Sequence, residues 1–181
     1  MNTRTLLPLV LLSVVLGCGR VSTREARTLV AHYNAVVCEA YRKGDIRIID
    51  SVVGLDAPDG RRLTGLIGVR QDMGLALDAK MESLKITGVE QAKDDLRIRT
   101  KETWTYRDLK VDTGQQVGEA SVDRYEMLYH FRKQKGAWMV EETQFTSPPQ
   151  VGRKEVPWTM NARDVHGMVA PPSKEIEREK P

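Results

Sequence analysis

Apolar and polar residues in the first part of the chain follow the period of an α-helix. Between residues 23 and 43, apolar side chains recur every three or four positions, which predicts one long helix with a continuous buried face. Ser22 and Glu25 occupy the positions of a capping box at its start, and Gly44 is suited to end it. The pattern therefore predicts a helix with a defined start, a defined end and one face that packs against a core.

Two shorter helices are predicted to follow. Apolar spacing over residues 46–53 favours a short helix closed by Gly54, and residues 55–62 have the composition of a loop. Thr64 is expected to cap a third helix whose buried face reaches Leu77. Several glycines weaken this third helix.

After the helices the apolar period changes from 3.6 to two, which is typical of β-strands. Strands are predicted at residues 83–90, 96–109, 120–133 and 137–146, with a turn or loop at 111–119. The side chains expected on one face of the second and third strands are Leu96, Ile98, Thr100, Glu102, Trp104 and Tyr106, and Asp123, Tyr125, Met127, Tyr129 and Phe131. Helices followed by antiparallel strands indicate an α+β fold with the helices packed on one face of the sheet.

The end of the chain has a different composition. Residues 147–181 are rich in proline and charge, which predicts a largely disordered tail. Trp158 lies in its most apolar stretch, and an exposed tryptophan there is a candidate contact for a protein partner. The alternative is that Trp158 folds back onto its own domain.

The start of the chain has the parts of an export signal. A mostly apolar run from Leu6 to Leu16 follows Arg4. As a helix this run spans about 16 Å, roughly half of a bilayer core, so an uncleaved membrane anchor is not expected. The sequence Val15-Leu16-Gly17-Cys18 resembles the lipobox of bacterial lipoproteins.

This resemblance implies how the protein is processed and where it is anchored. Residues 1–17 are expected to be a signal peptide that is removed, and residues 18–22 a short tether with acyl chains on Cys18. Because acyl chains contribute about 0.8 kcal/mol per buried methylene, two or three chains hold a protein on a membrane almost permanently. The expected location is the cell membrane or the outer membrane, facing the periplasm or the exterior. Gly19, in place of an aspartate at this position, favours the outer membrane.

Composition adds two constraints. The chain has 28 basic and 25 acidic residues, mixed along its length, so it lacks the clustered basic face that nucleic-acid binding requires. If Cys18 is lipidated, Cys38 has no intramolecular partner and the fold cannot depend on a disulfide. Cys38 is expected to be a small buried residue of the first helix.

The segment Ala40-Tyr41-Arg42-Lys43-Gly44-Asp45-Ile46, followed by one more helix and long strands ending in an aromatic hairpin, resembles the nuclear-transport-factor-2-like superfamily. The resemblance covers about residues 23–146. Within that group, residues 101–106 and 125–140 look most like non-catalytic domains of membrane-anchored proteins, such as the domain of chloroplast-division proteins that faces the intermembrane space. The resemblance implies a cone-shaped domain, in which a curved antiparallel sheet wraps the helices and leaves a pocket at its wide end. Members of the superfamily include enzymes as well as domains that only bind or scaffold, so the fold alone does not define the function.

Candidate catalytic residues are few. Glu102 and Asp123 share the phase of inward-facing residues on adjacent strands, and Tyr125 or Tyr129 is a candidate donor beside them. A carboxylate near a strand end more often meets solvent or an arginine. The histidines do not converge and no metal-ligand spacing is present, so neither a metal nor a cofactor is expected.

A set of aromatic residues offers a candidate ligand pocket. Trp104, Tyr106, Tyr129 and Phe131 could line it, although aromatic residues that alternate on paired strands are more often ordinary core. The function expected from these features is a non-catalytic binding or scaffold module of the bacterial cell envelope, with a possible envelope protein partner or a homodimer formed through the sheet. The alternative is a protein that binds a small apolar ligand in the cone pocket, or an isomerase- or hydrolase-type enzyme that uses it.

Overall fold

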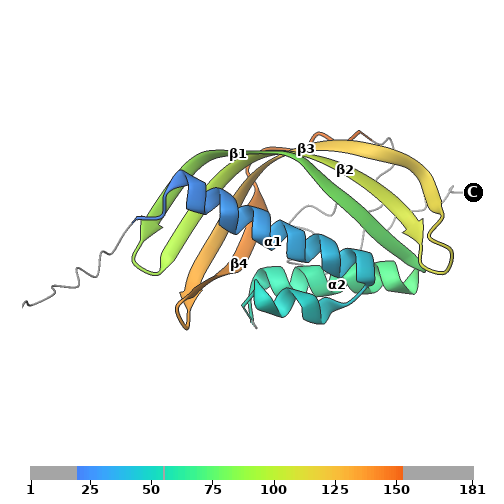
Figure 1. Ribbon diagram of the computed structural model, residues 1–181, viewed down its shortest axis with the longest axis horizontal. Coiled ribbons are helices and arrows are strands. Elements are labelled where there is room, and N and C mark those ends of the chain that lie inside the picture. The colour runs from blue at the N-terminus through green and yellow to red at the C-terminus, as the bar shows by residue number, and fades with distance from the viewer. Residues whose placement is uncertain (1–19, 55, 153–181) are drawn as a thin grey trace, which may run out of the picture.

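A long helix crosses the concave face of a curved antiparallel sheet (Figure 1). The computed structural model describes residues 20–54 and 56–152. In this part of the chain the strands follow one another in the order β1-β2-β3-β4. The elements are α1 (Thr23–Lys43), η1 (Ile46–Ser51), α2 (Pro58–Asp72), β1 (Leu75–Ala92), β2 (Asp95–Lys110), β3 (Gln116–Gln134) and β4 (Ala137–Phe145). The predicted α+β class, with helices packed in a curved antiparallel sheet, is confirmed.

Helix α1 has the ends that its sequence predicts. The Glu25 amide donates to the Ser22 hydroxyl at 3.2 Å, and the Ser22 amide donates to the Glu25 carboxylate at 2.8 Å, which completes the capping box. Gly44 ends the helix in the left-handed region at φ 64°. The buried residues of the helix are Ala26, Val30, Tyr33, Asn34, Val37 and Ala40.

The boundary between α2 and β1 differs from the prediction. The helix begins at Pro58, because proline suits the first helical position, whereas Thr64 lies exposed in its middle and caps nothing. The helix ends before Gly74, whose φ of 67° turns the chain into the sheet. Leu77 is therefore a buried residue of β1, not of the helix, and β1 starts at Leu75 rather than at residue 83. The spacing of apolar residues could not reveal this boundary. Buried residues occur both in α2, before Gly74, and in β1, after it, so the apolar pattern continues across the change of structure.

The sheet is a meander with long strands and an alternating inward face. Its register places Trp104 opposite Asp123 and Glu102 opposite Tyr125. The three strand pairs of the described sheet contain four register shifts, two between β1 and β2 and one in each of the other pairs, and such bulges bend and twist a sheet locally. The free edge of β4 is partly covered, because Val53 forms a parallel bridge with Val140.

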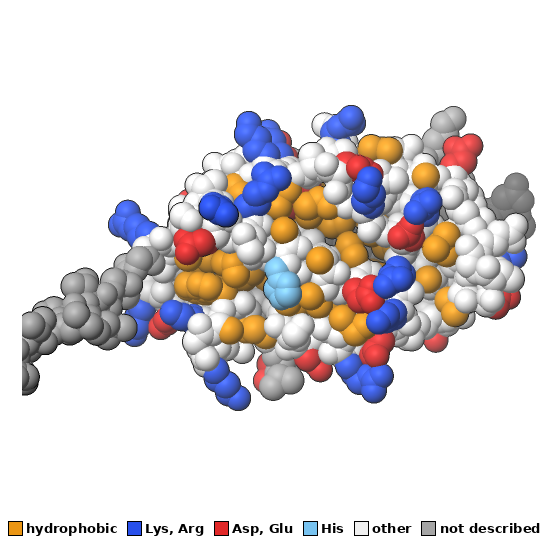
Figure 2. Space-filling view, in the orientation of Figure 1, with side chains coloured by type: hydrophobic (Ala, Val, Ile, Leu, Met, Phe, Trp, Pro, Cys, Tyr) orange, Lys and Arg blue, Asp and Glu red, His pale blue; other side chains and the backbone are white. Residues whose placement is uncertain are grey.

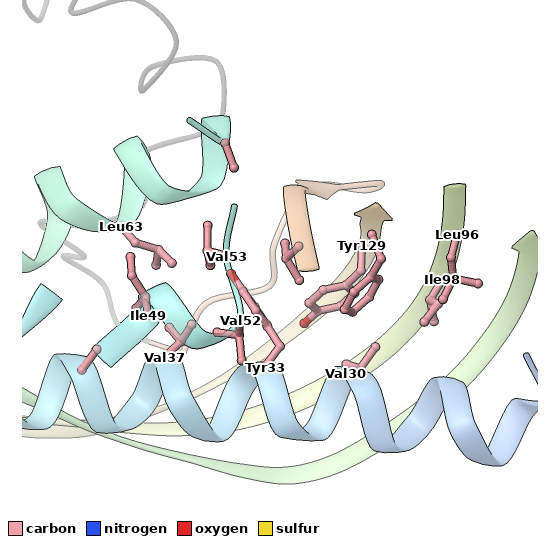
Figure 3. Packing of buried hydrophobic residues seen from close by; sticks show 14 of the residues in the cluster. Val30, Tyr33, Val37, Ile49, Val52, Val53, Leu63, Leu96, Ile98 and Tyr129 are labelled. Carbon is pink, nitrogen blue, oxygen red and sulfur yellow. The ribbon is translucent and has the colours of Figure 1, made fainter. Parts of the chain in front are cut away.

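The core lies between α1, η1, α2 and the half of the sheet near the β1–β2 and β3–β4 turns. Val30 and Tyr33 of α1 approach Ile98 of β2 and Tyr129 of β3 (Figure 3). The rings of Tyr33 and Tyr129 meet edge to face, with centroids 5.7 Å apart. Burial of these side chains is the main force that holds the long helix in the sheet.

The chain continues along β3 after β4 ends. Gln150 and Arg124 exchange backbone hydrogen bonds of 2.8 and 3.0 Å, so the first residues of the predicted tail lie against the sheet. Cys18 and Trp158 lie outside the described residues. Within residues 20–54 and 56–152, no helix combines the length and the apolar character needed to cross a bilayer.

Two glycines provide a matched test of this fold. Gly44→Ala should destabilise the protein by about 1–2 kcal/mol, because an L-residue is strained in the left-handed region that Gly44 adopts at φ 64°. Gly65→Ala should stabilise it by about 0.5–1 kcal/mol, because Gly65 lies in α2 with open space around its Cα. Urea unfolding of both variants measures the two effects, and effects of the same sign would contradict this description of α1 and α2.

Candidate functional site

A cavity of about 210 Å³ lies between the two α-helices and the concave face of the sheet. Residues of α1, α2 and all four strands line it. The lining includes all five tyrosines of the chain, which are Tyr33, Tyr41, Tyr106, Tyr125 and Tyr129. The wall of the cavity is therefore largely apolar and aromatic, but it also carries tyrosine hydroxyl groups.

Glu102 lies on this wall and is 4% exposed. One of its oxygens accepts hydrogen bonds from the hydroxyl of Thr100 at 2.6 Å and from that of Tyr129 at 2.7 Å. The other accepts from the indole N–H of Trp104 at 2.8 Å. The amide of Asn34 on α1 donates to the Tyr129 hydroxyl at 2.9 Å, which links the helix to the cluster. Burial, and next the Glu102 carboxylate, raise the pKa of Tyr129 well above its ordinary value.

Asp123 is 2% exposed and has a comparable set of donors. Its Oδ1 accepts from the Ser121 hydroxyl and from the backbone amide of Gly152 at 3.1 Å. Its Oδ2 accepts from the Tyr125 hydroxyl at 2.8 Å. Asp123 therefore also holds the segment that follows β4, and Pro149 of that segment forms part of the cavity wall.

The two carboxylates share one local pattern. A residue with a hydroxyl group stands two positions before each acid, and an aromatic donor stands two positions after it. The two segments are Thr100-x-Glu102-x-Trp104 and Ser121-x-Asp123-x-Tyr125. Residues two apart on a strand share a face, so the neighbours along each strand can satisfy the buried acid. Both predicted acids thus line the cavity, but the hydrogen bonds among the described residues do not join them to each other.

A third buried acid, Asp59, was not a sequence candidate. It lies in the first turn of α2 at 2% exposure. Its carboxylate accepts from the Tyr33 hydroxyl, from Arg62 at 2.6 and 3.0 Å, and from the Thr143 hydroxyl at 2.7 Å. Burial, and next the charge of Asp59, raise the pKa of Tyr33 well above its ordinary value. The three-residue spacing of Asp59 and Arg62 is the one signal in the sequence for this pair, and the loop predicted for residues 55–62 conceals it.

A second ion pair also reaches the cavity. Arg70 of α2 bonds Asp108 of β2 at 2.6 Å, with side chains only 5% and 10% exposed. Tyr41 of α1 lies on the same side of the cavity, and burial raises its pKa to about 12. The helix side of the cavity thus carries arginines paired with aspartates.

The aromatic candidates divide between wall and core. Trp104 stacks on Tyr106 with centroids 5.8 Å apart, and Tyr125 continues the row to Phe145 at 5.3 Å. Trp104, Tyr106 and Tyr129 line the cavity, as a ligand pocket requires. Phe131, the fourth candidate, is instead a core residue that is 2% exposed. It lies two residues beyond Tyr129 on β3, toward the β3–β4 hairpin and away from the cavity.

The remaining chemistry of the described residues is limited. Cys38 is half-buried on the cavity wall, and burial raises the pKa of its thiol to about 11. His32 is exposed on α1, and His130 contacts Asp95 at 2.5 Å. Within residues 20–54 and 56–152, no group of three His, Cys, Asp or Glu residues is placed to hold a metal ion.

Comparison with known proteins defines the fold. No protein-family model matches the chain, and no curated protein matches it. The intermembrane-space region of the chloroplast protein ARC6 has a similar structure, with a TM-score of 0.62 and 15% identity over 72% of this chain and 100% of that chain. A nuclear transport factor 2-like superfamily protein from Salmonella enterica has a TM-score of 0.50 and 10% identity over 76% of this chain and 99% of that chain. The domain therefore has the nuclear-transport-factor-2-like fold that the sequence resemblance implied.

The hydrogen bonds to Glu102 lead to a stability prediction. Glu102→Gln should destabilise the protein by about 1–3 kcal/mol, because an amide nitrogen cannot accept and one buried donor loses its partner. The control is Glu126→Gln, whose carboxylate pairs with Lys101 at 43% exposure and whose loss should cost less than about 1 kcal/mol. Urea denaturation measures both. Equal stability of the two variants would contradict the role assigned to Glu102.

Proposed function

We propose that this protein is a lipid-anchored envelope protein whose domain binds a small, largely apolar ligand in its cavity without catalysing a reaction. The observation that carries this proposal is the cavity of about 210 Å³ with its row of aromatic side chains. Concave sites lined by apolar and aromatic side chains, with a few placed polar groups, are typical of ligand binding. Binding of a small apolar ligand in the cone is the alternative that the sequence analysis left open beside the scaffold module, and this cavity favours it.

The hydrogen bonds of the two wall carboxylates support binding over catalysis. A general base must reach the proton that it removes, usually within about 2.6–3.2 Å. Both oxygens of Glu102 and both oxygens of Asp123 already accept hydrogen bonds from the fold itself. Each acid thus accepts three hydrogen bonds from the fold and keeps only about one of its four lone-pair sites for a substrate, and this is the reason we rank an isomerase- or hydrolase-type enzyme second.

The position of the first described residues supports the proposed anchor. Val21 donates its amide to Gln91 at the end of β1, at 2.7 Å, so the domain begins three residues after Cys18. Three residues reach at most about 10 Å, which would hold this end of the domain close to the lipid. Exposed Arg20, Arg24 and Arg27 lie at the same end, where Figure 2 shows basic side chains beside the start of the described chain. Basic residues next to an anchor favour an anionic membrane surface.

The proposed protein partner is assigned to the C-terminal side of the domain. Gly152, the last described residue, donates its amide to Asp123 at 3.1 Å beside the cavity. Trp158 stays a candidate for that contact. The homodimer is less favoured, because the outer face of the sheet carries exposed ion pairs such as Lys101 with Glu126 at 2.6 Å, and charged residues are depleted at interface cores.

A cavity-filling substitution tests ligand binding. The full chain would be purified from envelopes and its retained small molecules identified by mass spectrometry after denaturation. Ala79→Phe should reduce the retained ligand about tenfold or more, because Ala79 lines the cavity and a phenyl ring there occupies its space. Ala35→Phe is the control, since Ala35 is exposed on α1. Equal retention by the two variants would contradict binding in this cavity.

The anchor is tested separately. Cys18→Ser removes the proposed acylation site, so incorporation of labelled palmitate should fall to background and the protein should leave the membrane fraction. Cys38→Ser is the matched control and should keep the label, because Cys38 lies on the cavity wall of the folded domain. Retained palmitate in Cys18→Ser would exclude the lipoprotein assignment.

A further inference from the structure

The charges on the helix side of the cavity are balanced within the fold. The charged residues on the cavity wall are Arg62, Arg70, Glu102 and Asp123. Arg62 bonds Asp59 at 2.6 Å, and Arg70 bonds Asp108 at 2.6 Å. Each guanidinium therefore has its own buried or nearly buried carboxylate, and neither pair leaves a net charge on the wall.

The charges on the sheet side are not balanced. Glu102 and Asp123 accept hydrogen bonds only from neutral groups of the described residues, namely hydroxyls, an indole N–H and a backbone amide. Three donors directed at each group match the acceptor-only chemistry of an ionised carboxylate. Neutral donors lower the cost of burying such a charge but do not cancel it. The sheet side of the cavity is thus negative, and no lysine or arginine within residues 20–54 and 56–152 bonds either acid.

Aromatic faces stand next to these two acids. Trp104 stacks on Tyr106 at 5.8 Å, Tyr106 lies 6.3 Å from Tyr125, and Tyr125 lies 5.3 Å from Phe145. The row runs across β2, β3 and β4, and all four rings line the cavity. The face of an aromatic ring attracts a cation, and aromatic rings combined with carboxylates are suited to an organic ammonium group.

We infer that the cavity binds an organic cation, a protonated amine or quaternary ammonium on an apolar body, with its charge directed at Glu102 and Asp123 and its body against the row from Trp104 to Phe145. The inference rests on the proposed ligand-binding function and names the ligand's chemical class. The ammonium does not need a direct hydrogen bond to a carboxylate oxygen of Glu102 or Asp123, because the attraction between unit charges acts over several ångström in a partly buried site.

Two other classes of ligand fit less well. An anion would enter the field of two carboxylates that no arginine or lysine of the described residues neutralises. A metal ion would need a cluster of ligating side chains, and within residues 20–54 and 56–152 no such group of three is present. An organic cation is the class that uses both the charge and the aromatic wall.

Three probes of one shape test the inference. 1-Naphthylmethylammonium, 1-naphthalenemethanol and 1-naphthoate share a ring system and differ in charge. Each is titrated into the full-length chain in detergent, and the indole N–H signal of Trp104 is followed by NMR. Comparing each variant with the wild type for the same probe removes any effect of partition into detergent. Glu102→Gln and, separately, Asp123→Asn should weaken binding of the ammonium about tenfold and leave binding of the alcohol within about twofold.

The outcomes separate the inference from the function on which it rests. The control Glu126→Gln, at an ion pair on the outer face of the sheet, should leave all three affinities unchanged. If the alcohol and the ammonium bind and neither acid variant affects the ammonium selectively, the cation inference is wrong and the binding function stands. If no probe shifts the Trp104 signal, the proposed binding function fails and the inference fails with it. Because Asp123→Asn repeats the test at a second strand, a folding defect in Glu102→Gln does not decide the result.

Discussion

The buried carboxylate of Glu102 imposes the strictest local requirement in this domain. An ionised acid in the interior must receive hydrogen bonds, and here three side chains provide them. Two of these donors lie on its own strand, and the third, Tyr129, lies on β3. Because Asn34 donates to Tyr129 from α1, the same cluster joins the long helix to the middle of the sheet. The positions of Trp104 and Tyr129, and with them much of the cavity wall, follow from satisfying this one group.

The cavity has two sides that differ in how their charges are balanced. The helices contribute arginines that are neutralised by Asp59 and Asp108, whereas the sheet contributes two acids held by neutral donors. The fold thus uses several hydrogen bonds to hold the carboxylates of Glu102 and Asp123 beside the cavity. A domain that served only as a rigid spacer would have no use for that arrangement, and replacing buried polar groups by apolar ones is often neutral or stabilising. This is the physical reason for proposing that the cavity binds a ligand.

Much of the fold could be predicted because local signals agreed with the final packing. The capping box at Ser22, the left-handed Gly44 and the inward phase of Leu96 to Trp104 are all found in the structure. The start of β1 could not be predicted, because Leu77 suits the apolar face of a helix as well as that of a strand. Asp59 was missed for a related reason, since a loop reading of its segment concealed the helical pairing with Arg62. Trp104 lines the cavity, whereas Phe131 fills the core. This difference depends on how far α1 covers the sheet, which no short-range pattern in the sequence encodes.

The most direct test of this account is hydrogen exchange at the indole N–H of Trp104, measured by NMR and assigned with Trp104→Phe. Trp104 is 5% exposed and donates to Glu102 at 2.8 Å. If the acid is held by the fold, this proton should exchange only when the domain opens, at least about a hundredfold more slowly than in the unfolded chain. Exchange as fast as that of an unfolded peptide would show that Glu102 is not held in this cluster, and would contradict the proposal that the cavity is a preformed binding site.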